Sequence, residues 1–295
     1  MPWTFFDTGT LHLATFEQPM FLIEPIIPHG GIVVLHGPKT AGKTQLALTL
    51  GIAVAQGTMF LGEYACRQGP VVFLEADMTI QTLQSRVRLA EGTKLLHFLH
   101  TEPFDVVKLA ATLPLPTAVL QAQQCNPALL IVDSLRKTNV GDEISSATPS
   151  RVFAAWKRLF PNATLLFIHH DRKKPRDPEA YTHAEEAARG TGAWLDDADT
   201  GLHLTRVRGS SDGHVCSLTF SKCRTTEEPP ALILRMHEES LLVEPTKPSA
   251  RQALWTWRQE HPKATKEEAR EWFLKQKLGG RSLAYRLVSE LWDAK

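Results

Sequence analysis

Five short apolar segments recur along the first 207 residues, and each ends in glycine or polar residues. They are GIVVLHG (31–37), PVVFLEAD (70–77), ALLIVDS (128–134), ATLLFIHH (163–170) and TGLHLTRV (200–207). Near-continuous apolar runs of this length are typical of strands buried on both faces of a parallel sheet. The stretches between them, such as 42–57 and 150–160, have helical spacing and length. Alternating strands and helices predict an α/β fold with a doubly wound sheet, in which ligands bind beyond the carboxyl ends of the strands.

The pattern changes after about residue 200. Residues 200–224 and 230–245 each contain two apolar runs around a turn signal, which predicts antiparallel hairpins that extend the sheet. EPTKPS (244–249) is a proline-containing break, and beyond it the spacing predicts three short helices, the second starting with a capping box of Thr265 and Glu268. We therefore expect one sheet domain over residues 1–245 and a small all-α module over residues 250–295.

Composition indicates a globular protein without membrane association. Of the 295 residues, 43% are hydrophobic and 22% are charged, and the net charge is +1. From Thr246 onwards 11 basic residues stand against 6 acidic ones, a weak sign of a polyanionic partner. The four cysteines form no C-x-x-C pair, which fits a reducing compartment. No apolar run approaches the ~18 residues of a membrane span, and the N-terminus lacks a signal-peptide pattern, so cytoplasm is the expected location.

Residues 37–44, GPKTAGKT, fit the phosphate-loop pattern G-x-x-x-x-G-K-[ST] between a predicted strand and a predicted helix. Gly37 and Gly42 are expected to leave room for backbone N–H groups to face phosphate oxygens. Lys43 would neutralise the β- and γ-phosphates, and Thr44 would bind Mg²⁺. For Lys39 a solvated side chain is the stronger interpretation. The expected nucleotide-binding residues are Gly37, Pro38, Lys39, Thr40, Ala41, Gly42, Lys43, Thr44 and Gln45, with ATP and Mg²⁺ as cofactors.

Carboxylates follow two other predicted strands. Asp133 ends LLIVD and is expected to hold Mg²⁺ through water, beside Thr44. Glu75 and Asp77 end VVFLEAD, where their spacing would put both on one face of an extended strand. Hydrolysis requires a base that orients the attacking water. The sequence favours Glu75 for this role and keeps Asp77 as the alternative.

His169 and His170 end LLFIHH, at the tip of another predicted central strand. A polar side chain at this position can respond to the γ-phosphate and transmit its loss to the following loop. A lone histidine would be interpreted as a hydrogen-bonded core residue. Two adjacent histidines favour a sensing role for at least one of them.

The order of these motifs resembles the RecA-like ATPases and is most similar to the RepA-type hexameric replicative helicases. GPKTAGKT is followed by LEAD, VDSLRKT, HHDRKK and ARGTGAWLDDAD, and the match covers about residues 20–245. DnaB-type helicases and RecA/RadA recombinases show the same order more loosely. The resemblance implies a RecA-like, mostly parallel sheet that binds and hydrolyses ATP.

The resemblance also implies an active site shared between subunits. FSKCR carries Lys222 and Arg224 as K-x-R at a late strand end, and in this superfamily such a pair reaches into the neighbouring ATP site. A solvated basic strand end is the alternative. A finger acting in trans requires a closed ring or a helical filament, and the resemblance implies a homo-oligomeric, hexameric ring.

Two segments, 135–151 and 171–190, match by position the loops that bind single-stranded DNA in this family. Their cations can grip phosphates without reading sequence, although the second segment is charge-balanced and a solvated loop is the alternative. These cations are Arg136, Lys137, Arg172, Lys173, Lys174 and Arg176. The tail resembles a helix-turn-helix that would present Arg281 and Arg286 to DNA. Small helical modules also serve in oligomerisation, and the four tryptophans of this module are expected in its core.

Together these features predict an ATP-driven, ring-forming motor on single-stranded DNA, a replicative helicase with a primase or another replication protein as a further partner. A strand-exchange recombinase is the first rival, although such proteins usually polymerise through a segment before the ATPase core and only some 20 residues precede it here. The second rival is a KaiC-like regulatory ATPase whose cycle switches partners. A small-molecule kinase is disfavoured because the chain has no arginine-rich, lid-like segment.

Overall fold

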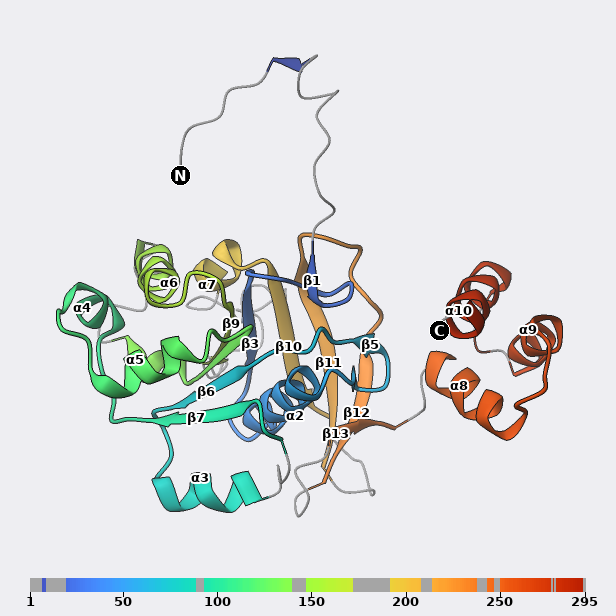
Figure 1. Ribbon diagram of the computed structural model, residues 1–295, viewed down its shortest axis with the longest axis horizontal. Helices are drawn as coiled ribbons and strands as arrows, with labels where there is room; N and C mark the ends of the chain where they lie inside the picture. Colours follow the sequence, from blue (N-terminus) through green and yellow to red (C-terminus); the bar gives the residue numbers. More distant parts are fainter. Residues whose placement is uncertain are drawn as a thin grey trace, which may run out of the picture.

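A nine-stranded mixed sheet forms the centre of the protein (Figure 1). The computed structural model describes residues 7–8, 20–88, 93–139, 147–171, 192–207, 214–237, 243–246, 250–276, 278 and 280–293. The strand order is β13-β12-β11-β10-β3-β9-β8-β6-β7, and β10, β3, β9, β8, β6 and β7 run parallel. This arrangement confirms the predicted α/β class with a mostly parallel sheet.

All five predicted core strands form. They are β3 (Ile32–Gly37), β6 (Val71–Glu75), β8 (Leu129–Asp133), β9 (Thr164–His170) and β10 (Thr200–Arg206). A sixth parallel strand, β7 (Leu96–His100), lies at the sheet edge and was not predicted. Its sequence LHFLH is mostly half-exposed, because an edge strand needs no continuous apolar run.

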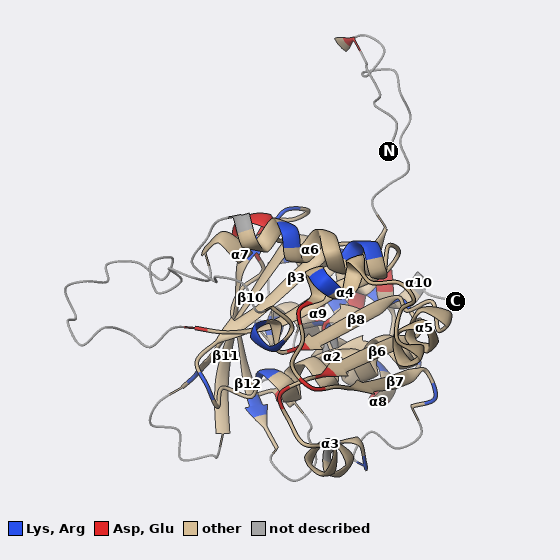
Figure 2. Ribbon diagram, turned by 90° about the vertical axis from the view of Figure 1, so that its left-hand side faces the viewer, with Lys and Arg blue, Asp and Glu red and all other residues tan. Residues whose placement is uncertain are grey.

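Helices cover both faces of the parallel strands. On one face α2 (Lys43–Gln56) packs on alternate strand residues such as Val33, Leu35 and Ile131. On the other face the intervening residues, including Val34 and Leu130, belong to a second core. The helices beside this sheet are α3 (Ile80–Val87), α4 (Val106–Ala111), α5 (Thr117–Gln124), η2 (Leu135–Thr138), α6 (Ala147–Leu159) and α7 (Gly192–Asp197). The strands are mostly uncharged, whereas charged residues lie on helices and strand ends (Figure 2).

Antiparallel strands complete the sheet, as the two late apolar regions predicted. β10 pairs with β11 (His214–Cys223), β11 pairs with β12 (Leu232–Met236), and β12 pairs with β13 (Val243–Pro245). A bulge shifts the β10–β11 register between Gly201 and Leu202. Two short hairpins stand outside this sheet: β1 (Phe21–Ile23) with β2 (Ile27–Pro28), and β4 (Met59–Phe60) with β5 (Tyr64–Ala65).

Three helices follow the sheet, as predicted: α8 (Ala250–Glu260), α9 (Lys266–Lys275) and α10 (Arg281–Asp293). Both hydrogen bonds of the predicted capping box at Thr265 are present. The helices enclose their own hydrophobic cluster, which buries Leu254 and Phe273. Trp257, Trp272 and Trp292 pack against this cluster, but Trp255 is 48% exposed, so the prediction of four core tryptophans is wrong for that residue.

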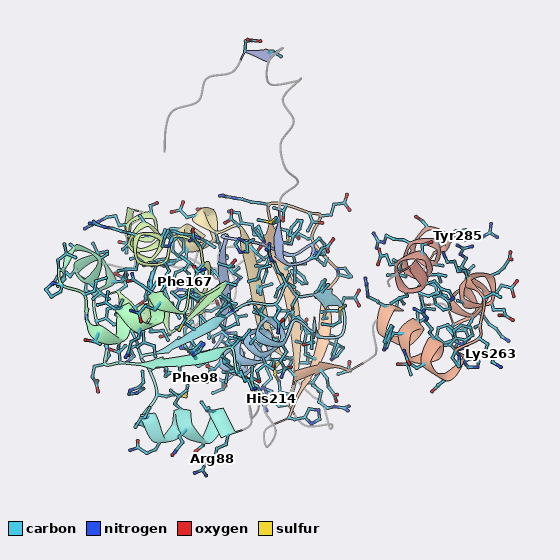
Figure 3. The ribbon with its side chains drawn as sticks, viewed as in Figure 1. Arg88, Phe98, Phe167, His214, Lys263 and Tyr285 are labelled. Atoms are coloured by element: carbon cyan, nitrogen blue, oxygen red, sulfur yellow. The ribbon has the colours of Figure 1, made fainter. Side chains whose placement is uncertain are left out.

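Side chains follow the same division between interior and surface. Phe167 of β9 is fully buried between the sheet and its helices, whereas Tyr285 points outward from α10 (Figure 3). Among the described residues, no helix combines the length and apolar character that a membrane crossing requires.

Candidate nucleotide-binding and catalytic site

The predicted phosphate loop lies between β3 and α2, at the carboxyl edge of the parallel strands. Gly37 and Gly42 have φ angles of 152° and 90°, and Thr40 also has a positive φ of 65°. A Cβ at Gly37 would lie 2.1 Å from the carbonyl oxygen of Leu204. Glycine is therefore required at position 37 because β10 approaches closely. This differs from the reason predicted from the sequence, which was room for backbone N–H groups to face phosphate oxygens. Gly42 is the N-cap of α2 and provides no side-chain cap, so the helix N-terminus suits an anion.

Lys43 occupies the inside of this loop. Its side-chain ammonium donates hydrogen bonds to the carbonyl oxygens of Gly37 at 2.8 Å and Pro38 at 2.7 Å. It is 4% exposed, and burial lowers the pKa of Lys43 to about 8. A buried cation is stabilised by an anionic partner, so the loop is chemically suited to a phosphate.

The other residues of the predicted nucleotide-binding set are either exposed to solvent or engaged in packing. Lys39 is exposed, as its solvated interpretation predicted, and Ala41 is buried. The side-chain amide of Gln45 donates to the carbonyl oxygen of His237 at 2.9 Å, at the end of β12. That amide is therefore engaged in packing α2 against the sheet, although the sequence grouped Gln45 with the nucleotide contacts.

Thr44 and Asp133 meet as the sequence predicted. The Thr44 hydroxyl donates to Asp133 Oδ2 at 2.6 Å, and Asp133 is 4% exposed at the tip of β8. A hydroxyl and a carboxylate side by side at a phosphate loop form a hard oxygen donor set that suits Mg²⁺. The residues present therefore fit the implied ion.

Glu75 is the buried carboxylate of the site. It pairs in register with Asp133 across β6 and β8 and is 0% exposed. Its Oε1 accepts the backbone N–H groups of Asp77 at 2.7 Å and Met78 at 2.8 Å. Its Oε2 is buried without a hydrogen-bond partner among the described residues. Burial first, and then the charge of Asp133, raise the pKa of Glu75 to about 7.

Asp77 does not share a strand face with Glu75, so this prediction is wrong. β6 ends at Glu75, because the Glu75 carboxylate accepts the N–H groups of the next residues and bends the chain into a turn. The Asp77 side chain is 41% exposed, and its Oδ1 lies 3.4 Å from Lys137 Nζ on η2. Glu75 is therefore a buried carboxylate, whereas Asp77 is a surface carboxylate.

His169 and His170 lie beside the phosphate loop because β9 pairs with β3. Gly37 pairs with His170, and His36 pairs with His169. His169 is 7% exposed, and burial lowers its pKa to about 4. Burial, and then the charge of Lys43, lower the pKa of His170. The Nδ1 atoms of both rings are buried without a hydrogen-bond partner among the described residues, so each ring keeps one polar atom for another contact.

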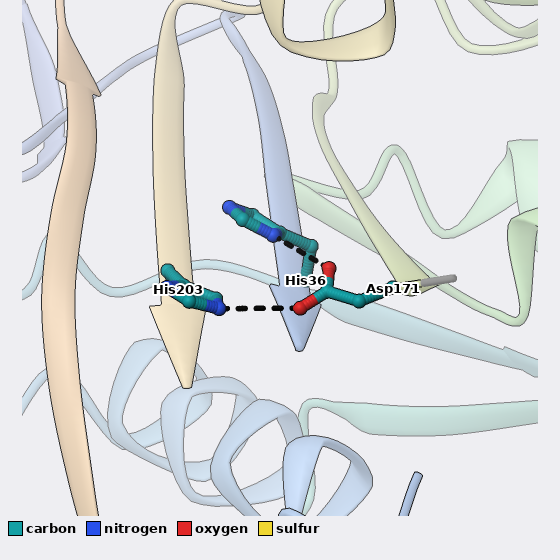
Figure 4. A group of neighbouring side chains, drawn as sticks. All are labelled: His36, Asp171 and His203. Atoms are coloured by element: carbon teal, nitrogen blue, oxygen red, sulfur yellow. Dashed lines mark hydrogen bonds and ion pairs between the residues drawn. The ribbon is translucent and has the colours of Figure 1, made fainter. Parts of the chain in front are cut away.

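The strand register also brings together His36, Asp171 and His203, a group that the sequence analysis missed. Asp171 Oδ1 lies 2.9 Å from His36 Nδ1, and Asp171 Oδ2 lies 3.2 Å from His203 Nε2 (Figure 4). Burial alone would raise the pKa of Asp171, but the hydrogen bonds to the two histidines hold it below its ordinary value. Asp171 also donates its backbone N–H to Gly37 O at 3.1 Å, so it joins β9, β3 and β10 at the loop.

These three side chains do not have the geometry of a metal centre, although their donor atoms lie within 4.8 Å of one another. The two imidazole rings stack at 4.4 Å with an interplanar angle of 9° and point to different carboxylate oxygens. Ligands of one ion must converge on it, and two parallel rings cannot do so. We therefore interpret the group as a carboxylate held by two hydrogen bonds. The sequence carried only one signal for it, a polar residue near the end of three neighbouring strands.

A family model described as an AAA domain matches residues 6–176. The chain belongs to this AAA domain family. Among solved structures, one ATPase domain is similar with a TM-score of 0.55 and 12% identity, over 74% of this chain and 85% of that one. A DnaB-like replicative helicase, whose structure also describes its interactions with primase, matches with a TM-score of 0.54 and 13% identity. The match covers 74% of this chain and 58% of the helicase chain. These matches confirm the RecA-like fold.

In this AAA domain protein, Lys222 and Arg224 lie at the opposite end of the sheet from the phosphate loop. Cys223 pairs with Thr200 at the start of β10, whereas the phosphate loop follows the end of β3. Lys222 Nζ donates to Leu195 O and Asp196 O, both at 2.7 Å. Arg224 donates to Asp196 O at 2.9 Å and to Asp199 Oδ1 at 3.4 Å. Both cations therefore contact the end of α7 in their own chain.

The residues predicted to contact DNA are only partly covered by the described structure. Arg136 is exposed on η2, and Lys137 of the same helix contacts Asp77. Arg281 and Arg286 are exposed on α10, and Arg286 Nε lies 3.9 Å from Glu290. The remaining predicted contacts lie outside the described residues: Arg172, Lys173, Lys174 and Arg176.

Proposed function

We propose that the AAA domain protein is an ATP-driven, ring-forming motor on single-stranded DNA. The observation that carries the hydrolytic part is the position of Glu75. A buried carboxylate with one oxygen unpartnered among the described residues lies in register with Asp133, which contacts Thr44 at the start of α2. This arrangement supports a site where phosphate, metal and attacking water are held by separate groups.

ATP would be held by the phosphate loop and the N-terminus of α2. Lys43 would exchange its carbonyl partners for the β- and γ-phosphates, and Thr44 and Asp133 would hold Mg²⁺. Mg²⁺ supplies charge neutralisation on the phosphates. The contact between Thr44 and Asp133 at 2.6 Å supports their assignment to one ion.

Glu75 orients the water that attacks the γ-phosphate. A general base works best when its pKa lies close to the working pH, and the pKa of Glu75 is raised to about 7. Asp77 is a weaker candidate because it is exposed and paired with Lys137. His170 lies beside Gly37 in the β3–β9 register, and its Nδ1, unpartnered within the described structure, supports a role in sensing the γ-phosphate. His169 is more deeply buried, so His170 is the stronger candidate for this role.

Arg224, with Lys222, would complete the site of a neighbouring subunit. Both residues lie far from their own phosphate loop, at the other end of the sheet. A contribution to catalysis therefore has to be made in trans, which requires a ring or filament of identical subunits. An arginine supplied in this way can stabilise charge in the transition state. We propose a hexameric ring, as the resemblance to replicative helicases implies.

Single-stranded DNA is the proposed polyanionic partner. Arg136 and Lys137 on η2 follow Asp133 directly, so cations lie within a few residues of the proposed metal ligand. The segment with Arg172, Lys173, Lys174 and Arg176 is proposed to act with them. Residues 250–295, with Arg281 and Arg286, would form a separate module that contacts DNA or a replication protein such as a primase. The separate hydrophobic cluster of α8–α10 supports the division from the sheet domain at 1–245.

Steady-state ATP hydrolysis with and without oligo-dT tests the proposal. We expect DNA to raise the rate several-fold, with a slope on salt concentration that reflects phosphate contacts. Lys43→Ala serves as the control without nucleotide binding. An unchanged rate at saturating DNA would contradict a DNA motor and favour the regulatory ATPase.

A further inference from the structure

Asp77 and Lys137 form an ion pair between two parts of the protein for which the sequence motifs predict different roles. Asp77 Oδ1 lies 3.4 Å from Lys137 Nζ, and the two side chains are 41% and 40% exposed. The motifs make Asp77 an alternative base and Lys137 a DNA contact. The structure makes them neighbours beside the turn that holds the Glu75 carboxylate.

Asp77 belongs to the turn that holds the Glu75 carboxylate. The N–H groups of Asp77 and Met78 both donate to Glu75 Oε1. The same turn is tied to the sheet, because Ala76 donates its N–H to Asp133 O at 2.8 Å. His100 on the edge strand β7 holds the carbonyl of Met78 at 2.9 Å. The Asp77 side chain therefore belongs to one of the two residues whose N–H groups fix Glu75 Oε1.

Lys137 belongs to η2, which begins two residues after Asp133. Its backbone is held on both sides, by a hydrogen bond from its N–H to Ser134 O at 3.0 Å and from Phe104 N–H to its carbonyl at 2.9 Å. Its ammonium, in contrast, reaches into an open groove of about 390 Å³ lined by residues including Asp77, Thr79, His100 and Glu102. A phosphate can reach this ammonium from solvent without any rearrangement of η2.

We propose that the Asp77–Lys137 ion pair restrains the turn that holds Glu75, and that phosphates of single-stranded DNA release this restraint by competing for Lys137. Asp77 is then a positioning residue that acts through Glu75, and it takes no part in the chemistry. The DNA half of this inference rests on the proposed DNA motor, whereas the effect of the restraint on hydrolysis rests on the proposed role of Glu75 alone. An exposed ion pair of this length is weak and is screened by salt, so a polyanion can displace it.

A double-mutant cycle on the full chain tests the restraint. Asp77→Asn keeps the backbone N–H groups and removes the charge, and Lys137→Met keeps most of the side-chain length and removes the cation. We expect each variant to raise kcat for ATP without DNA by up to about 5-fold, because an exposed ion pair contributes at most about 1 kcal/mol. KM for ATP should stay the same, since neither residue belongs to the phosphate loop or to the proposed metal ligands. The double variant should be no faster than the single variants, because one interaction is lost in all three.

The reversed pair, Asp77→Lys with Lys137→Asp, provides the decisive rescue. It should return the DNA-free rate of hydrolysis toward the wild-type value. The dependence of that rate on salt concentration should also become like that of the wild type. Glu102→Gln removes an exposed carboxylate from the same groove and is the matched control, with an expected rate equal to wild type. Equilibrium binding of a fluorescent ATP analogue verifies that each variant remains folded.

The outcomes separate this inference from the proposed function. Loss of hydrolysis in Asp77→Asn would mean that Asp77 acts on the water, and this would overturn the inference. The inference would also be overturned if the single variants left the DNA-free rate unchanged, or if their effects on that rate were additive in the double variant. If DNA fails to stimulate ATP hydrolysis by the wild type, the proposed DNA motor is wrong. The double-mutant cycle measured without DNA then still decides whether the ion pair restrains Glu75. If DNA stimulates the wild type and Lys137→Met equally, the release step is wrong.

Discussion

Burial of Glu75 predicts a stability that depends on pH in a specific way. The pKa of Glu75 rises from its ordinary value of 4.5 to about 7 in the folded protein, first because of burial and then because of Asp133. The folded state therefore binds the proton more tightly than the unfolded state does. Its contribution to stability is fully present below pH 4.5 and is lost as the pH rises through 7. One pKa unit corresponds to about 1.4 kcal/mol, so about 2 kcal/mol is lost between pH 5 and pH 8.

Glu75→Gln removes this titration while keeping an oxygen that accepts the N–H groups of Asp77 and Met78. Its buried amide adds a donor without a partner, which changes the stability by a constant amount at all pH values. We therefore measure the free energy of unfolding in urea for wild type and Glu75→Gln between pH 5 and pH 8, and take the difference at each pH. Titrations of groups that do not interact with Glu75 cancel in this difference. Glu102→Gln, at the exposed groove, is the control for loss of a surface carboxylate.

The expected result is that the wild type loses about 2 kcal/mol relative to Glu75→Gln as the pH rises from 5 to 8. The same variant should bind ATP and lose hydrolysis by a factor of at least about 100, because the group that orients water is absent. Parallel stability curves, or a difference that grows in the opposite direction, would refute the description of Glu75 as a buried carboxylate with a raised pKa. Normal hydrolysis by the variant would refute its role as the base.

Three further predictions concern the same edge of the sheet. Asp171→Asn leaves His36 and His203 with weaker partners, and it should lower the free energy of unfolding by about 2 kcal/mol in urea titrations; an unchanged value would show that the two hydrogen bonds contribute nothing. Gly37→Ala places a Cβ 2.1 Å from Leu204 O at a φ of 152°, so it should destabilise the fold by about 3 kcal/mol, whereas wild-type stability would contradict the close approach of β10. The pKa of His169 falls from 6.5 to about 4 on burial, so the unfolded state binds more protons between these values. The His169 contribution to stability should therefore fall by about 2 kcal/mol from pH 7 to pH 5, opposite in sign to that of Glu75, and it should appear as the difference between the wild-type and His169→Asn stability curves; parallel curves would contradict the assignment to His169.

The sequence predicts the central part of the fold and of the site because both depend on local patterns. Each buried parallel strand is a short apolar run, and its polar end residue necessarily lies at the shared carboxyl edge. Thr44 and Asp133 are therefore predicted together from two separate motifs, and the structure joins them at 2.6 Å. The capping box at Thr265 is equally local and forms as expected.

The features that the sequence does not predict depend on register and on packing between distant segments. His36, Asp171 and His203 meet only because β9, β3 and β10 pair as neighbours with one particular register. The turn after β6 forms because the Glu75 carboxylate accepts two N–H groups, so alternation along an extended strand placed Asp77 on the wrong side. β7 was missed because an edge strand carries no continuous apolar run. The intrachain contacts of Lys222 and Arg224 with α7 likewise join residues about 27 positions apart in the chain.

ATP hydrolysis by a mixture of two inactive variants is the most direct test of the shared, DNA-stimulated site. Arg224→Ala keeps an intact Glu75, and Glu75→Gln keeps an intact Arg224. In a randomly mixed ring about a quarter of the interfaces contain both intact residues, because each site takes its finger from the neighbouring subunit. We predict that each variant alone is inactive with oligo-dT and that the equal mixture recovers about a quarter of the wild-type rate, if the sites act independently. A mixture that remains inactive, or an Arg224→Ala protein that hydrolyses ATP at the wild-type rate, would contradict an active site shared between subunits.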